Sequence, residues 1–78
     1  MDWAKIKEVD GATLLIDKGY DVDEKAYFVH VTAQDDNDAR AALNLEFETM
    51  EDRDRMFDEG EPMLKKIVNQ FRELGINI

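Results

Sequence analysis

The sequence contains no cysteine and no serine, and its 78 residues include only one histidine, one proline and four glycines. Without cysteine, neither a disulfide framework nor a thiolate zinc site can support the fold. A chain this short removes only about 60% of its unfolded surface from water when it folds. Stability must therefore come from well-matched apolar faces or from a partner chain, and we expect a single domain over residues 1–78.

Long apolar runs are also absent. No segment approaches the roughly 18 consecutive apolar residues that a membrane span needs. The N-terminal stretch MDWAKIKEVDG has neither the apolar centre nor the small-residue cleavage pattern of a signal peptide. A chain without cysteine suits a reducing compartment. We therefore expect a soluble, cytoplasmic protein that does not enter a membrane.

The net charge of −9 is concentrated in the middle of the chain. Residues 1–9 are neutral, residues 10–61 hold 16 acidic and 5 basic side chains, and residues 62–78 have a net charge of +2. The acidic field disfavours direct binding to nucleic-acid phosphates and attracts a basic protein partner. Negative charge also keeps small proteins soluble, which is a simpler explanation for it.

The first two thirds of the sequence predict an antiparallel meander of three to four strands. Asp10-Gly11 is a favoured two-residue hairpin turn, although residues 2–9 also fit a short helix. Aromatic and β-branched residues mark the clearest strand, and strict alternation of apolar residues marks the last one. The expected segments are a hairpin over residues 4–17, a polar connection over 18–25, a strand over 26–33, a loop over 34–38 and a strand over 40–47.

The last third predicts helix. Thr49 and Asp52 have the spacing of an N-cap and its capping box. Apolar residues from Met50 to Leu74 recur in steps of three, four and seven, which keeps them on one helix face. Gly60 and Pro62 interrupt this pattern, so we expect either one C-terminal amphipathic helix or two helices broken near Gly60-Pro62.

These elements predict an α+β fold in which the helices pack on one sheet face. If they cover Tyr27, Val29 and Val31, the opposite face of that strand exposes Phe28 and His30. An apolar open face on a small sheet indicates burial against another surface, and a second copy of the chain is the commonest such surface. We therefore expect a homo-oligomer with Phe28 and His30 among its partner-binding residues.

A second candidate surface lies in the stretch EDRDRMFDEGEP. On a helix, steps of three, four and three would bring four carboxylates into one stripe. Such a stripe suits contact with a basic partner, or imitation of a nucleic-acid backbone. The four residues are Glu51, Asp54, Asp58 and Glu61.

Catalytic and metal-binding patterns are weak. The acidic segments over residues 21–24 and 35–38 lack the alternating ligands and late glutamate of a calcium loop. His30 and Thr32 share a strand face, but no orienting carboxylate adjoins them in sequence. We therefore expect no metal, no cofactor and no enzymatic activity.

Three functions follow from these features. The first is a small non-enzymatic interaction module, a homodimer or accessory subunit that binds a protein partner of unknown identity. The alternative is an acidic inhibitor that imitates nucleic acid and occupies the nucleic-acid site of a basic partner. A third and weaker possibility is an enzyme or metal binder that uses His30 and nearby acidic residues.

Overall fold

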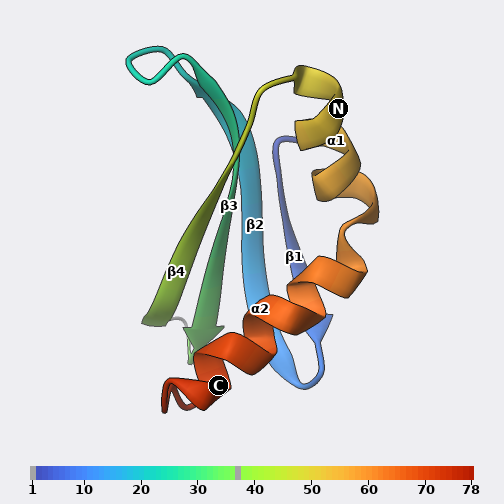
Figure 1. Cartoon of the computed structure of the whole chain (residues 1–78). Coiled ribbons are helices and arrows are strands. Elements are labelled where there is room, and N and C mark those ends of the chain that lie inside the picture. The colour runs from blue at the N-terminus through green and yellow to red at the C-terminus, as the bar shows by residue number, and fades with distance from the viewer. Residues whose placement is uncertain (1, 37) are drawn as a thin grey trace.

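The computed structural model describes residues 2–36 and 38–78, which form one antiparallel sheet and two helices (Figure 1). The strands lie in the order β1-β2-β3-β4, so each pairs with its neighbour in sequence. This confirms the α+β meander with helices packed on one face. The elements are β1 (Ala4–Val9), β2 (Ala12–Asp21), β3 (Ala26–Asp35), β4 (Asp38–Phe47), α1 (Met50–Glu59) and α2 (Glu61–Glu73).

The first hairpin forms at the predicted turn. Asp10 and Gly11 both have positive φ angles, 48° and 83°. Two successive residues of this kind define the type I′ turn, whose twist matches that of the flanking strands. Because this turn pairs β1 with β2 along its whole length, residues 4–9 are a strand and not a helix.

The central hairpin is longer than the sequence indicates. β2 continues through Lys18 to Asp21, where a polar connection was expected, and the turn is confined to residues 22–25. The Asp21 carboxylate accepts hydrogen bonds from the backbone N–H groups of Asp23 and Glu24, which closes the turn locally. As a result the β2–β3 hairpin projects beyond the rest of the molecule (Figure 1).

The expected loop over residues 34–38 is likewise shorter. β3 extends to Asp35 and β4 begins at Asp38, with Asp36 at a positive φ of 50°. Asn37, the remaining residue of the expected loop, lies outside the described residues. A bulge follows, because Ala33 pairs with Ala41 whereas Gln34 pairs with Ala39, so one β4 residue has no partner across the ladder.

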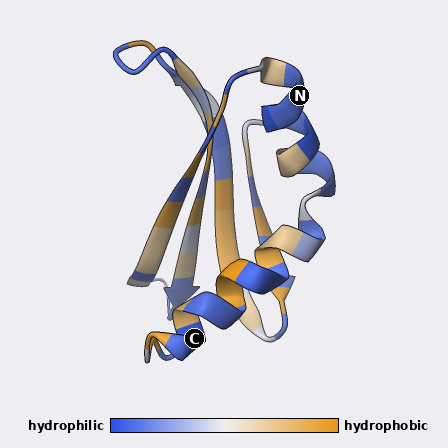
Figure 2. Cartoon of the chain, viewed as in Figure 1, coloured by the Kyte–Doolittle hydropathy of each residue, from blue (hydrophilic) through white to orange (hydrophobic). Residues whose placement is uncertain are grey.

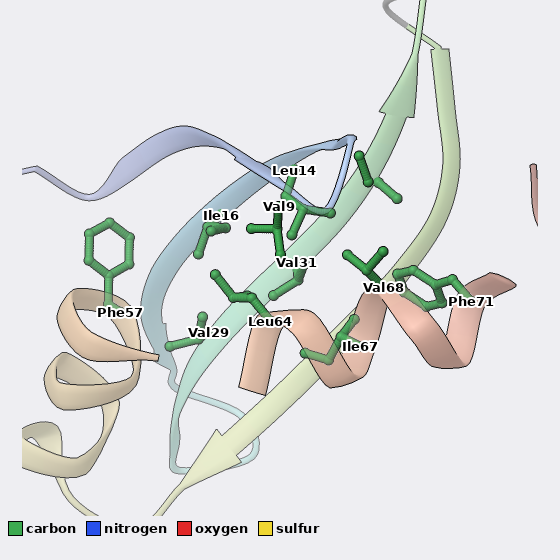
Figure 3. Close-up of a cluster of buried hydrophobic side chains, with 12 residues drawn as sticks. Val9, Leu14, Ile16, Val29, Val31, Phe57, Leu64, Ile67, Val68 and Phe71 are labelled. Atoms are coloured by element: carbon green, nitrogen blue, oxygen red, sulfur yellow. The ribbon is translucent and has the colours of Figure 1, made fainter. Parts of the chain in front are cut away.

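The core lies between the helices and one face of the sheet. Leu14 and Ile16 of β2 and Val29 and Val31 of β3 are almost completely buried. Figure 3 shows the side chains of α2 pointing toward these strands, with Phe57 of α1 standing apart from them. Apolar stretches accordingly lie along β2 and α2 in Figure 2, while hydrophilic residues dominate α1. The buried residues of α2 are Leu64, Ile67, Val68 and Phe71.

The helical segment begins and ends with recognised capping motifs. The Thr49 hydroxyl accepts a hydrogen bond from the Asp52 N–H at 3.1 Å and caps α1. At the other end, Gly75 at φ 87° donates to the Arg72 carbonyl, and Ile76 donates to the Phe71 carbonyl. This pair of bonds is the Schellman motif, which ends α2. Neither helix of the described residues is long and apolar enough to cross a membrane.

The chain uses two helices, because it breaks at Gly60. The break also corrects the prediction of one continuous apolar face. Met50 and Leu74, at its two ends, are exposed. A change of direction between the helices means that a single 3.6-residue phase cannot face the sheet along the whole segment.

Candidate functional site

Within residues 2–36 and 38–78, no helix or strand covers the sheet face opposite the helices (Figure 1). The strand register aligns Ile6 with Leu15, Leu15 with Thr32, and Thr32 with Ala42. We call these four residues the open-face row. The row crosses all four strands without a charged side chain, and Ile6 is 69% exposed. It is the uncharged band of this face.

Phe28 lies on the open face, on the side of β3 away from the buried Val29. Its strand neighbours are Gly19 on β2 and Glu46 on β4. A Cβ atom on Gly19 would lie 2.6 Å from Cζ of the Phe28 ring, so this ring covers the glycine. An aromatic ring over a strand glycine shields the exposed backbone there. Phe28 is therefore half-buried by its own chain.

His30 also lies on the open face, and the sheet gives it a neighbour that the sequence did not suggest. The register places Asp17 on one side of His30 and Asn44 on the other. Asp17 is far from His30 along the chain, so only the pairing of β2 with β3 brings them together. No hydrogen bond or ion pair within the described residues joins this histidine to Asp17.

The predicted acidic stripe forms only in part, because Glu51, Asp54 and Asp58 lie on α1 whereas Glu61 lies on α2. Asp54 turns toward the sheet, where its Oδ1 lies 2.9 Å from Lys18 Nζ and 3.0 Å from Arg53 Nε. Glu61 belongs to α2 and lies 3.6 Å from Lys7 Nζ. Glu51 and Asp58 stay exposed on α1. The break at Gly60 separates Glu61 from the other three carboxylates, and these two ion pairs neutralise part of the charge of the four.

The six predicted partner-binding residues therefore do not make one site. Phe28 and His30 lie on the open face, whereas Glu51 and Asp58 lie on a helix that covers the opposite face. The sheet separates the two groups. A single partner surface can contact one group or the other, so we treat them as separate candidates.

A buried cation–aromatic cluster holds α1 on the sheet. Arg53 is only 3% exposed and Lys18 only 8%. The Arg53 guanidinium lies 5.2 Å from the ring centroids of both Trp3 and Tyr27, and it donates to the Gly19 carbonyl at 3.1 Å. Cations held against aromatic faces in this way are stabilised by the ring quadrupoles. The cluster is thus a structural anchor of α1.

This cluster was not predicted from the sequence, although the positions of Lys18 and Arg53 indicate it. Lys18 is in the same strand phase as Leu14 and Ile16, and Arg53 lies four residues before Phe57 on the helix. Both cations therefore occupy positions that point into the core. Long basic side chains are normally assigned to the surface, because they are rarely buried without a partner.

Asp54 is the shared counter-ion of the two cations. The hydrogen bond from Lys18 is the main cause that lowers the pKa of the Asp54 carboxyl, partly opposed by desolvation, and Arg53 adds to the lowering. A carboxyl whose pKa is lower when folded contributes stability above its unfolded pKa, and that contribution is lost as pH falls through the folded pKa.

Asp54→Asn should therefore lower the free energy of unfolding at neutral pH, and it should lower it less at acidic pH. We expect the difference in free energy of unfolding between wild type and Asp54→Asn to be constant above about pH 4, the ordinary pKa of an aspartic acid. The difference should shrink as pH falls below that value. Urea denaturation between pH 2 and pH 7 measures it, and Asp58→Asn on the exposed side of α1 is the control. A difference that did not change with pH would contradict the role of Asp54.

An open groove of about 500 Å³ lies between the two helices and the end of β4. Its apolar lining comes from Phe47, Met56, Pro62 and Met63. Its charged rim is formed by Asp52, Arg55, Glu59 and Lys66. The groove lies on the helix side of the sheet, away from the open-face row. It is a third candidate surface that sequence reasoning did not find.

Among residues 2–36 and 38–78, no group of three or more histidine, aspartate or glutamate side chains is arranged to hold a metal ion.

No protein-family model, curated protein or solved structure matches this chain. Its function is therefore inferred from its own surfaces. These are the open face, the exposed acidic residues of α1 and the groove.

Proposed function

We propose that this protein is a small non-enzymatic interaction module that binds a protein partner through the open face of its sheet. One observation carries the proposal: the helices cover a single face, and the open-face row crosses the other without a charge. Burying such a band against a partner removes apolar surface from water at about 25 cal/mol per Å². The expected cytoplasmic location is part of the proposal.

The surroundings of the row fit a protein interface. Interfaces combine an apolar centre with a polar rim. Here Ile6 and Leu15 form the apolar centre, and Asp17, His30 and Asn44 form the adjoining polar row. The rim and the net charge of −9 favour a partner with basic residues. A second copy, the partner expected from the sequence, would carry the same −9, so we favour a different, basic protein.

The inhibitor alternative has less support. A nucleic-acid mimic needs carboxylates spread over one surface at the spacing of phosphates. Of the four residues expected to provide them, Asp54 and Glu61 are in ion pairs with Lys18 and Lys7. Glu51 and Asp58 stay exposed, so substitution of these two residues tests the inhibitor alternative.

Ile6→Asp should abolish capture of the partner without unfolding the protein. Ile6 is 69% exposed, so its replacement removes little packing, but it puts a charge in the open-face row. We expect at least about tenfold less partner in quantitative affinity purification from the native cell. Val22→Asp, at a 75% exposed valine in the β2–β3 turn, is the matched control and should capture as wild type does.

The salt dependence of capture separates the two functions. Binding through the open face should persist at moderate ionic strength, whereas binding by exposed carboxylates should weaken steeply. Loss of capture in Glu51→Gln with Asp58→Asn, together with normal capture in Ile6→Asp, would overturn the proposal in favour of the inhibitor.

A further inference from the structure

The two edges of the sheet differ in how they are protected. The strand order leaves β1 and β4 with one unpaired side each. On β1, Lys5 Nζ donates to the Phe57 carbonyl and Lys7 pairs with Glu61, so lysines tied to the helices line this edge. Edge lysines of this kind discourage the addition of another strand.

β4 has no such protection. It is ten residues long and contains neither lysine nor proline. Beyond the bulge, its residues 41–47 pair regularly with β3, so the other side of this stretch offers a regular row of backbone donors and acceptors. An edge of this kind is a template for an added strand.

The helix side of β4 is incompletely covered. Val29 and Val31 of β3 are fully buried, yet their β4 partners Leu45 and Leu43 are only half-buried. The helices thus cover the middle of the sheet better than its β4 margin. Apolar surface is left there for the side chains of an added strand.

The groove lies at the end of this margin. Phe47 is the last residue of β4, and it lines the groove together with Met56 and Met63. Methionine side chains adapt to differently shaped apolar groups. An added strand along β4 directs every second side chain to the helix side, where the groove can receive it.

The remaining side chains of an added strand point to the open face and meet acidic residues. Glu46 is the exposed open-face residue near the end of β4, and the exposed Glu48 lies two residues further along the chain. Arg40, the basic residue of the strand, lies at its other end, 3.6 Å from Asp35. Basic side chains at these alternate positions are therefore favoured by charge.

We propose that the β4 edge and the groove bind an extended peptide segment of a partner protein, in which apolar side chains alternate with basic ones. Backbone hydrogen bonds to residues 41–47 supply affinity, and the groove and Glu46 select the alternating pattern. This surface shares only Ala42 with the open-face row and uses the backbone edge of β4, so the inference does not depend on the function proposed above.

The test uses a fluorescein-labelled ten-residue peptide in which lysine alternates with valine and leucine. The comparison peptide has the same composition with its lysines in one block, which removes the two-residue period. By fluorescence anisotropy, the alternating peptide should bind at least about tenfold more tightly than the block peptide. Hydrogen exchange of the backbone amides within residues 41–47 should slow on binding, because the added ladder protects those that face the edge.

Two matched pairs of variants locate the site. Glu46→Lys and Met63→Glu should each weaken binding of the alternating peptide by about tenfold. Glu8→Lys makes the same charge change on β1, and Met50→Glu changes an exposed methionine that does not line the groove, so both should bind as wild type does. Ile6→Asp should also bind normally, which keeps this test separate from that of the open face.

Four results would overturn the proposal. Equal binding of the two peptides, or equal weakening by Glu8→Lys and Glu46→Lys, would show attraction to the acidic field alone. Absence of binding up to about 1 mM peptide would show that the edge is closed. Sedimentation equilibrium that reveals a dimer, dissociated by Glu46→Lys, would show that a second copy occupies the edge.

Discussion

Phe57→Ala should lower the free energy of unfolding by about 3–5 kcal/mol, the cost of deleting a buried aromatic side chain. Phe57 is 4% exposed, and it is the only apolar residue of α1 that is buried. Small domains are stable by only about 5–15 kcal/mol in total. The variant should therefore be marginally folded at room temperature.

The loss of stability in Phe57→Ala should exceed the loss caused by the missing apolar packing alone. The ammonium groups of Lys5 and Lys18 lie 4.5 and 4.8 Å from the centroid of the Phe57 ring. Without the ring, both cations lose an attractive partner. Because Arg53 is the only other buried residue of α1, we expect this helix to detach before the sheet unfolds.

Urea denaturation followed by circular dichroism measures the loss. Met50→Ala is the control in the same helix, since Met50 is exposed, and it should change stability by less than about 0.5 kcal/mol. If Phe57→Ala cost less than about 1 kcal/mol, the packing of α1 on the sheet described above would be wrong.

Gly60→Ala should destabilise the protein by about 1–3 kcal/mol, the range of an overpacked site. An added Cβ atom would lie 2.3 Å from the Met56 carbonyl oxygen and 2.5 Å from the Met56 sulfur. The side chain can rotate away, but the carbonyl belongs to the last full turn of α1. The backbone between the helices must therefore shift.

Straightening the chain into one helix would not relieve the contact. Alanine is the better helix former by about 1 kcal/mol, which favours a continuous helix. However, the ring of Pro62 would then clash with the carbonyl four residues earlier, that of Asp58. The two residues together explain why the break occurs where the sequence predicted it.

The effect of Gly60→Ala has a specific control. Gly75→Ala meets no atom within 4 Å, but it must hold a φ of 87°, which costs an alanine about 1–2 kcal/mol. Both variants should lower the urea midpoint. Only Gly60→Ala should also weaken binding of the alternating lysine peptide, because Gly60 lines the groove and Gly75 does not. Unchanged stability of Gly60→Ala would contradict the close approach to Met56.

Much of the fold was predictable, because its signals act over a few residues. Asp10 and Gly11 specify a turn by accepting positive φ, and Thr49 and Gly75 cap helix ends through bonds to near neighbours. The alternation in β4 identifies its two faces without knowledge of any other strand. The placement of Phe28 and His30 on one face followed from the same periodicity.

The candidate sites depended on contacts that a local pattern does not contain. Asp17 becomes the neighbour of His30 only through the β2–β3 register. The charge of Asp54 is paired because Lys18, from a distant strand, lies beneath α1.

Sequence patterns predicted most strand faces, the turn at Asp10-Gly11 and the break near Pro62, because backbone preferences and side-chain periodicity act locally. Contacts between elements settle which cations are buried, which carboxylates are paired, which edge is blocked by lysines, and where the groove lies. These features could not be predicted, because the free energy of a charged or half-exposed side chain depends on what another element places beside it.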